Sequence, residues 1–223
     1  MTNVIAASRD WYHDLPSRLA QRTGESFVLI EHPEALTLEH LKTLQPRYVF
    51  FPHWSHRIPD EIHESFECVI FHMTDVPFGR GGSPLQNLIS RGIHETKISA
   101  LRCVAELDAG PVYLKRDLSL HGSAQEIFLR ASRIIETMIA DILESPTEPV
   151  EQVGEVVAFK RRRPAEGDLV NLKDLEQVFD FIRMLDADGY PHAFLETEHL
   201  RLEFTRASLK HDSLLADVRI TKK

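Results

Sequence analysis

Residues 68–84 read CVIFHMTDVPFGRGGSP: an apolar run, then His72, then a bend rich in glycine and proline. A continuous apolar run bounded by turn residues is typical of a strand buried on both faces of a parallel sheet. His72 follows the run directly, so we expect it at the carboxyl end of that strand. Open α/β sheets bind their ligands beyond this end, which makes His72 the first candidate for a functional residue.

Three similar apolar runs and two helical patterns precede this stretch. The runs span residues 3–8, 27–30 and 48–51, and the helical patterns span residues 11–22 and 36–44. Gly24 is a stop signal for the first helix, and Thr37 is a candidate cap for the second. Strands that alternate with helices predict an α/β fold with a Rossmann-like, mostly parallel sheet covered by helices on both faces. His53 follows the third run as His72 follows the fourth, so we expect both at one edge of the sheet.

The rest of the chain predicts three further helices and four further strands. The helices are expected near residues 85–92, 123–143 and 172–185, and the strands near 97–104, 111–118, 200–205 and 216–220. Ser123 and Glu126 form a capping-box pattern before the longest helix. Residues 145–151 contain two prolines and predict a loop. We therefore expect a main domain at residues 1–150 and a small C-terminal α+β extension at residues 151–223.

The composition describes a globular chain without a general attraction to polyanions. Its 223 residues include 26 Lys and Arg against 34 Asp and Glu, a formal net charge of −8. This balance disfavours nucleic acids and anionic membranes as partners. No apolar stretch is long enough to span a membrane and the N-terminus lacks the features of a signal peptide, so we expect a cytoplasmic protein. Cys68 and Cys103 lie in apolar runs and are expected as buried free thiols rather than as a disulfide, a metal site or a nucleophile.

His72 and Asp108 form the candidate catalytic pair. Asp108 lies in the turn ELDAGP between two expected strands. A histidine titrates near neutrality and a nearby carboxylate can orient it, so the two suit proton transfer. The alternative for His72 is a core histidine bonded to a backbone carbonyl, but its place between a strand and a Pro/Gly-rich bend favours a functional role. His53 and His56 could suggest a metal pair, but no third ligand has suitable spacing, so we expect no metal.

Together these segments resemble the formyltransferases that use N10-formyltetrahydrofolate, which include methionyl-tRNA, glycinamide-ribonucleotide and amino-sugar formyltransferases. The family pattern Asn-x-His-x-Ser, Leu-Pro, Arg-Gly, Pro is matched in order by His72, Thr74, Val76-Pro77, Arg80-Gly81 and Pro84, and its later Leu-Asp-x-Gly turn by residues 107–110. Residues 163–194 resemble the segment that follows the core in the tRNA and amino-sugar enzymes. The chain departs from the pattern at Ile70, where the family has an asparagine that helps to bind the oxyanion. An isoleucine side chain cannot donate a hydrogen bond.

The resemblance implies a formyltransferase fold and formyl transfer to an amine through a tetrahedral intermediate. His72 would then stabilise the oxyanion and shuttle protons, and Asp108 would orient His72 and relay the proton of the amine. As the replacement for the missing asparagine we choose His53, at the end of the neighbouring strand, with His56 or Ser55 as the alternatives. The remaining implied site residues are Trp54, His56, Arg57, Ile58, Glu106 and Leu107, with Asp108, for the cofactor, and Thr74, Arg80, Gly81 and Gly82 for the acceptor substrate. The alternative for Trp54 and Ile58 is core packing, and for Arg80 a structural salt bridge.

The acceptor is inferred from charge and from the branch of the family that the chain resembles. Methionyl-tRNA formyltransferases carry a further basic β-barrel, whereas only a short segment follows Ser145 here. We therefore expect the primary amine of a nucleotide-linked amino sugar, used in glycan biosynthesis. The basic cluster 161–163 could bind an acceptor phosphate or carboxylate, with a solvated surface as the alternative.

Two other functions stay open at the level of sequence. Ile70 could mark a folate- or sugar-binding relative without turnover, although His72 and Asp108 are both retained. The same core also occurs in formyltetrahydrofolate hydrolases, which usually carry an extra N-terminal domain. Exposed C-terminal strands are potential pairing edges, which favours a homodimer.

Overall fold

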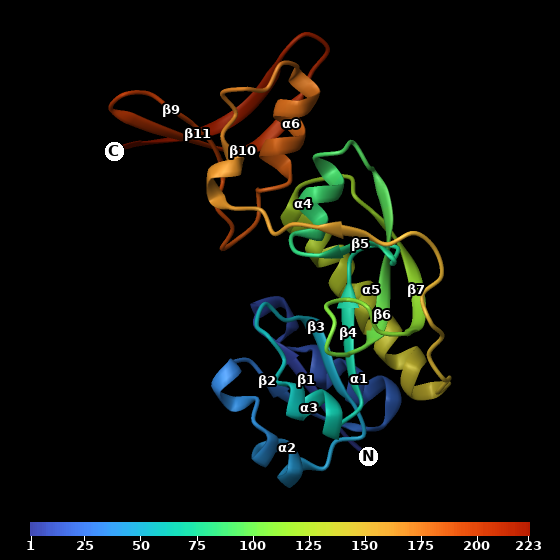
Figure 1. Ribbon diagram of the computed structural model, residues 1–223. Helices are drawn as coiled ribbons and strands as arrows, with labels where there is room; N and C mark the ends of the chain where they lie inside the picture. The colour runs from blue at the N-terminus through green and yellow to red at the C-terminus, as the bar shows by residue number, and fades with distance from the viewer. The chain divides into compact units, whose positions relative to one another are not determined.

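The computed structural model describes residues 1–223, and its largest sheet has six strands (Figure 1). It contains two compact units. The first comprises residues 1–80, 97–118 and 129–158, and the second comprises residues 81–96, 119–128 and 159–223. The chain passes between the units several times, so neither is one continuous stretch. The expected boundary between residues 150 and 151 stays a prediction.

The six-stranded sheet has the strand order β2-β1-β3-β4-β6-β7. Its strands are β1 (Thr2–Ala7), β2 (Ser26–Ile30), β3 (Val49–His53), β4 (Cys68–His72), β6 (Glu95–Arg102) and β7 (Val112–Ser119). The strands β2, β1, β3 and β4 are parallel, whereas β6 runs antiparallel to β4. The expected mostly parallel sheet is confirmed. His53 and His72 are the last residues of β3 and β4, so both lie at the carboxyl edge of the parallel strands.

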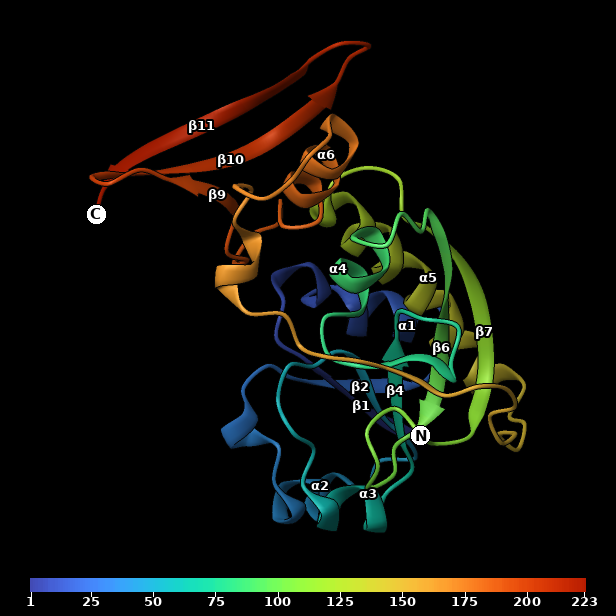
Figure 2. The same cartoon turned by 45° about the horizontal axis from the view of Figure 1, so that its top comes forward.

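Helices cover both faces of this sheet, as the alternating pattern predicts. They are α1 (Leu15–Thr23), α2 (Leu38–Leu44), α3 (Asp60–Ser65) and α5 (Ala124–Glu144). Figures 1 and 2 show α2 and α3 side by side. Helix α1 lies beside α5, where Arg18 Nε is 3.0 Å from Glu136 Oε2.

One face of the sheet packs against α2 and α3 through an apolar cluster. Its buried members are Val4, Ala6, Ile30, Leu36, Leu41, Val49, Phe51, Ile62 and Cys68. Trp54, Ile58, Ile70 and Cys103 are partly buried and pack against the same cluster. Successive side chains of a strand point to opposite faces, so His72 lies on the same face as Ile70. The end of β4 therefore carries His72 next to an apolar surface.

The first helix is shorter than its apolar spacing predicts. Residues Asp10–Tyr12 form a 3-10 turn, and α1 begins only at Leu15, with Pro16 in its first turn. Proline has no N–H to donate to the carbonyl four residues earlier, and its ring would clash there, so a continuous helix from residue 11 is not possible. Gly24 ends α1 in the left-handed conformation, with φ 71°, as predicted.

The predicted caps are present in two helices. The Oγ1 of Thr37 accepts a hydrogen bond from the backbone N–H of His40 at 3.2 Å. The backbone N–H of Ser123 donates to Glu126 Oε2 at 2.8 Å, and the backbone N–H of Glu126 donates back to Ser123 Oγ at 3.3 Å. These contacts satisfy N–H groups that the first turn of a helix cannot pair internally.

The remaining elements include the small C-terminal part. They are β5 (Phe78–Gly81), α4 (Pro84–Ile89), β8 (Val157–Phe159), a 3-10 turn (Pro164–Gly167), α6 (Leu175–Arg183), β9 (Ala193–Glu196), β10 (Leu200–Leu209) and β11 (Leu214–Lys222). The last three strands form the antiparallel sheet β11-β10-β9. With α6 they confirm the expected small α+β appendage. The sequence analysis did not predict α3, β5, β8 or β9, which are all six residues or shorter. No helix combines the length and the apolar character that a membrane span requires.

Candidate active site

His72 is buried at the end of β4, and both nitrogens of its ring have partners. Nε2 lies 2.8 Å from the backbone oxygen of Gly79, and Nδ1 lies 3.5 Å from Oδ2 of Asp108. A carbonyl oxygen only accepts hydrogen bonds, so Nε2 carries a proton that it donates to Gly79. Nδ1 is then the nitrogen that faces the carboxylate. The fold thus places His72 and Asp108, from two separate segments, in direct contact.

Asp108 is held in a tight turn between β6 and β7. Its backbone is left-handed, with φ 52°, a conformation that aspartate adopts more readily than most residues. Two residues later, Gly110 passes so close to the end of β6 that an added Cβ would lie 1.8 Å from the backbone oxygen of Arg102. Only glycine fits this approach. The Leu-Asp-x-Gly pattern therefore has a direct steric reason.

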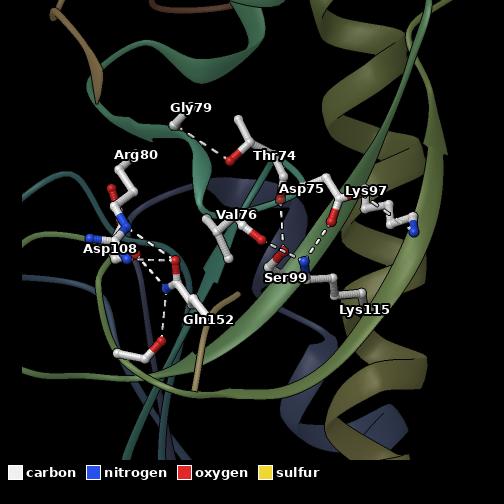
Figure 3. Close-up of polar contacts among 11 residues, drawn as sticks. Thr74, Asp75, Val76, Gly79, Arg80, Lys97, Ser99, Asp108, Lys115 and Gln152 are labelled. Carbon is white, nitrogen blue, oxygen red and sulfur yellow. Dashed lines mark hydrogen bonds and ion pairs between the residues drawn. The ribbon is translucent and has the colours of Figure 1, made fainter. Parts of the chain in front are cut away.

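The loop that follows His72 is fastened to β6 and β7 by two lysines (Figure 3). Lys115 Nζ donates to Asp75 Oδ1 at 2.5 Å and to the backbone oxygen of Val76 at 2.6 Å, and Lys97 Nζ lies 3.5 Å from Asp75 Oδ2. Burial alone would raise the pKa of Asp75, but the hydrogen bond and charge of Lys115, with the charge of Lys97, outweigh it and lower that pKa. Asp75 is therefore a negatively charged anchor for the loop near neutral pH.

Thr74 is fully buried and bonds within the same loop. Its hydroxyl donates to the backbone oxygen of Gly79 at 3.3 Å, and its own backbone oxygen accepts from Ser99 Oγ at 2.7 Å. The oxygen of Gly79 therefore accepts from both Thr74 and His72. A role of Thr74 in acceptor binding stays a prediction, and in the structure its hydroxyl supports the carbonyl that orients His72.

An apolar wall lies beside the pair. Trp54, Ile70 and Cys103 pack against the same cluster. Burial, and then the charge of Asp108, raise the pKa of Cys103 to about 11, so its thiol stays protonated near neutral pH. The indole Nε1–H of Trp54 is buried and has no acceptor. A buried donor without a partner costs about 1–3 kcal/mol, which makes this N–H available to an acceptor atom of a ligand.

His53 ends β3 and is surrounded by other parts of the first unit. Its ring meets the ring of Trp11 edge-on, with 5.7 Å between the ring centroids. Burial, and then the positive charge of Arg9, lower the pKa of His53 to about 4. His53 is therefore neutral near pH 7 and can offer a hydrogen bond but no positive charge. Its role as a replacement for the missing asparagine stays a prediction.

The loop 53–59 carries the other residues predicted to bind the pterin ring. The ring of His56 lies 5.3 Å from that of Trp54, in a T-shaped arrangement. Ile58 packs on the apolar cluster. Arg57 is exposed, and its Nη2 donates to both carboxylate oxygens of Asp60 at 2.9 Å. The sequence did not anticipate this ion pair, which ties Arg57 to the start of α3.

The turn 106–110 carries two more residues predicted to bind the cofactor, Glu106 and Leu107. Both are exposed. Glu106 Oε1 lies 3.3 Å from Nη1 of Arg80, whose side chain is largely buried. Arg80 also donates to Oε1 of Gln152 from Nε at 3.0 Å and from Nη2 at 2.9 Å. The guanidinium is thus held within the first unit, which corresponds to the structural salt bridge that we considered as the alternative for Arg80.

Gly81 and Gly82 belong to the second unit and pass close to the segment 159–161. A Cβ on Gly81 would lie 2.4 Å from the backbone oxygen of Phe159, and a Cβ on Gly82 would lie 2.5 Å from the Cβ of Arg161. The backbone N–H of Gly82 donates to Phe159 at 3.1 Å. These glycines are required for close packing of two chain segments, and a role in acceptor binding stays a prediction.

The basic cluster 161–163 also lies in the second unit. The guanidinium of Arg162 lies over the ring of Phe181, 5.2 Å from its centroid, and burial lowers the pKa of Arg162. Arg161 and Arg163 are exposed. One member of the cluster is therefore packed, and two are available to solvent or to an anion.

Three residues around the pair were not predicted from the sequence: Ser99, Lys115 and Gln152. Each donates to backbone carbonyls of the site loops. A backbone carbonyl is present at every position, so such a contact has no signature in the sequence. Only the folded geometry reveals these residues.

Comparison with solved structures identifies the family. A structure described as methionyl-tRNA formyltransferase from Clostridium thermocellum matches with a TM-score of 0.97 and 46% sequence identity, covering 100% of both chains. The chain belongs to the formyltransferase family. A family model described as "Methionyl-tRNA formyltransferase, C-terminal domain" matches residues 164–221. The formyltransferase fold expected from the sequence is therefore confirmed, and formyltransferases are a class of enzymes.

More distant relatives match part of this chain, and two further solved structures share its fold. Methionyl-tRNA formyltransferase of Malacoplasma penetrans is 24% identical over 171 residues, which is 73% of this chain and 54% of that protein. The chain spans about half the length of the curated relatives it matches. HypX from Aquifex aeolicus in complex with tetrahydrofolic acid matches with a TM-score of 0.71 at 18% identity, covering 92% of this chain and 37% of that one. A sugar N-formyltransferase from a Shewanella species matches with a TM-score of 0.70 at 13% identity, covering 89% and 93%.

The formyltransferase family uses N10-formyltetrahydrofolate as a co-substrate. The residues present here fit such a ligand. The apolar surface of Trp54, Ile58 and Ile70 suits a flat ring, and the unpartnered indole N–H supplies a donor beside it. No group of three or more His, Cys, Asp or Glu side chains is arranged to hold a metal ion.

Proposed function

We propose that the protein transfers the formyl group of N10-formyltetrahydrofolate to a primary amine. The buried contact between His72 and Asp108 carries this proposal, with 3.5 Å between Nδ1 and Oδ2 at the carboxyl edge of the parallel strands. An amine that gains an acyl group must lose a proton, and a histidine paired with a carboxylate suits that task. Burial strengthens the electrostatic interaction between the two side chains.

The contacts of His72 assign different tasks to its two nitrogens. Nε2–H is donated to Gly79, which fixes the orientation of the ring. The exchangeable proton is therefore the one at Nδ1, and Asp108 is the group that holds or relays it. Stabilisation of an oxyanion by His72 requires Nε2–H to be shared between Gly79 and the substrate oxygen.

A second donor is needed where Ile70 replaces the asparagine of the family pattern. Two N–H groups of the same region are candidates: the ring of His53, which is neutral because its pKa is about 4, and the indole of Trp54, which has no acceptor. Losing one oxyanion donor typically lowers turnover by about 10²–10³. A chain that keeps His72 and Asp108 therefore needs a compensating donor, and we assign the task first to His53.

For the acceptor, we propose the amine of a nucleotide-linked amino sugar. The net charge of −8 supports a small acceptor over an RNA, whose binding depends largely on neutralising phosphates. The second candidate is the amine of methionyl-tRNA. It is favoured by the 46% identity, along the whole chain, to the Clostridium thermocellum protein of that description.

The test is a formylation assay with N10-formyltetrahydrofolate and two sets of acceptors, nucleotide-linked amino sugars and charged methionyl-tRNA. Mass spectrometry measures the addition of a formyl group. We expect a product with an amino sugar, and a loss of about 10²–10³ in kcat in His72→Ala and Asp108→Asn. If only methionyl-tRNA is formylated, the proposed acceptor is wrong and the proposed reaction still holds. Wild-type rates in both variants would show that His72 and Asp108 are not the catalytic pair.

Two controls separate the other activities of this fold. Calorimetric titration with the stable 5-formyl isomer of tetrahydrofolate should give micromolar affinity, about −8 kcal/mol. Binding without product in any acceptor set would identify a binding protein without turnover. Release of formate at full rate without an amine would identify a hydrolase.

A further inference from the structure

A short segment after α5 contacts two parts of the candidate site, the loop that follows His72 and the turn that carries Asp108. We call residues 150–157 the strap. Val150 exchanges backbone hydrogen bonds of 2.7 and 2.9 Å with Val112 at the start of β7. At the other end, the backbone N–H of Val157 donates to Pro77 at 3.2 Å. The strap is therefore anchored at both ends by backbone contacts that do not depend on its side chains.

Between these anchors, the side chain of Gln152 bonds the turn that carries Asp108 (Figure 3). Its Nε2 donates to the backbone oxygens of Asp108 and Gly110, both at 2.8 Å. Its Oε1 accepts from Nε and Nη2 of Arg80 at 3.0 and 2.9 Å. An amide has two N–H donors and one oxygen. Both N–H groups of the amide thus donate to the turn, and its oxygen accepts from Arg80, the residue that follows Gly79.

We infer that Gln152 is a positioning residue that holds Asp108 in reach of His72. This inference rests on the proposed function. The carboxylate of Asp108 can meet Nδ1 of His72 only if the left-handed turn, with φ 52° at Asp108, keeps its place. Gln152 binds the backbone of this residue directly, so it acts on the carboxylate through the turn and touches no reacting atom.

The same side chain joins the two halves of the site. Arg80 lies one residue after Gly79, whose oxygen orients His72. Gln152 therefore connects the segment that fixes the histidine to the turn that fixes the aspartate. A carboxylate at this position could still accept from Arg80, but it has no N–H donor for the two carbonyl oxygens of the turn. This asymmetry allows the two arms of Gln152 to be tested separately.

The experiment compares Gln152→Glu and Gln152→Ala with Val153→Ala, a control in the same strap whose side chain is 88% exposed. Glutamate keeps an oxygen for Arg80 and places the other against two carbonyl oxygens, whereas alanine removes both arms. We expect kcat for formyl transfer to fall about 10-fold or more in both Gln152 variants. The affinity for 5-formyltetrahydrofolate should stay within about 3-fold of wild type, and Val153→Ala should match wild type.

Two readouts distinguish positioning from a general effect on stability. The pH profile of kcat/KM should be displaced in both Gln152 variants, because the contact between Asp108 and His72 changes. Hydrogen exchange of the Ala109 amide, which donates to Glu106 at 3.3 Å, should become faster in both variants and not in Val153→Ala. A lower unfolding midpoint with an unchanged pH profile and unchanged exchange would reduce Gln152 to a structural residue.

The outcomes also separate this inference from the proposed function. If the wild-type protein transfers no formyl group, the proposed function fails, and exchange at Ala109 still decides whether Gln152 holds the turn. If wild type is active and Gln152→Glu retains the wild-type rate while Gln152→Ala does not, only the hydrogen bonds between residue 152 and Arg80 are needed for activity. That result would overturn the assignment of Gln152 to Asp108.

Discussion

Replacing Gly110 by alanine tests whether the position of the Asp108 turn controls activity. The added Cβ would lie 1.8 Å from the backbone oxygen of Arg102 and 3.0 Å from its carbonyl carbon. An ordinary carbon–oxygen contact is about 3.3 Å or longer, so the two segments must separate by roughly 1.5 Å. Arg102 lies at the end of β6, and its backbone N–H donates to Pro111 at 2.9 Å, so the turn is the part that moves.

The displacement is large compared with the geometry that it disturbs. Nδ1 of His72 and Oδ2 of Asp108 are 3.5 Å apart, and both carbonyls that Gln152 binds lie in the moving turn. A misplacement of about 1 Å in an active site can lower the rate about 10²-fold, and overpacking typically costs about 1–3 kcal/mol of stability. We therefore expect Gly110→Ala to fold, to unfold at a lower urea concentration than wild type, and to have a kcat about 100-fold lower.

The assay measures kcat for formyl transfer and the free energy of unfolding in urea on the same preparations. Gly24→Ala is the matched control, since Gly24 is left-handed with φ 71° and has no neighbour within 4 Å of an added Cβ. It should lose about 1–2 kcal/mol of stability through backbone strain and keep wild-type kcat. A wild-type kcat in Gly110→Ala would refute the claim that the turn positions Asp108.

Three further predictions concern stability. Because burial lowers the pKa of His53 to about 4, protonation of His53 destabilises the folded protein, and the stability that is complete above pH 6.5 is lost as the pH falls towards 4. In urea titrations, His53→Gln should remove about 2 kcal/mol of this loss between pH 7 and 4.5. If the free energy of unfolding fell equally with pH in both proteins, the prediction would be contradicted. Arg183 is buried, with Nε 2.7 Å from Asp180 Oδ1 and Nη1 2.5 Å from the backbone oxygen of Leu120, so Arg183→Met should cost about 3–5 kcal/mol in calorimetry, and a change below 1 kcal/mol would show that the pair is dispensable. Thr37→Ala removes the cap of α2 and should cost about 1 kcal/mol in urea, whereas no change would mean that the cap is replaced by water.

The sequence predicted those parts of the fold that depend on side-chain pattern. Each apolar run became a strand, because a strand buried on both faces needs apolar side chains at successive positions. Helix starts depended on single residues: Pro16 delayed α1, and Asp174 placed the start of α6 at Leu175 by accepting from the backbone N–H of Gln177. In contrast, β9 (AFLE) has only three successive apolar residues, one fewer than the shortest runs that predicted strands.

The candidate site was predictable where its residues are chemically distinctive. The contact between His72 and Asp108 was predictable because His72 is an ionisable group at the end of an apolar strand and Asp108 lies in a distinctive turn between two expected strands. Gln152 was not found, because a glutamine in a polar loop is ordinary and its partners on the turn are backbone carbonyls. Arg57 was assigned to the cofactor, and its ion pair with Asp60 was not predicted, because such a contact depends on the direction of two side chains.

The orientation of the proposed catalytic pair depends more on backbone than on side chains. His72 is fixed by the oxygen of Gly79, and the Asp108 turn is fixed by two of its own carbonyls. Ile70 can therefore replace a polar residue beside His72 without moving the pair, since no hydrogen bond that orients the pair passes through that side chain. A glycine that permits close approach has no such freedom, because any Cβ at Gly110 enters the end of β6. We expect the chemistry of this site to tolerate changes in its wall more readily than changes in its turns.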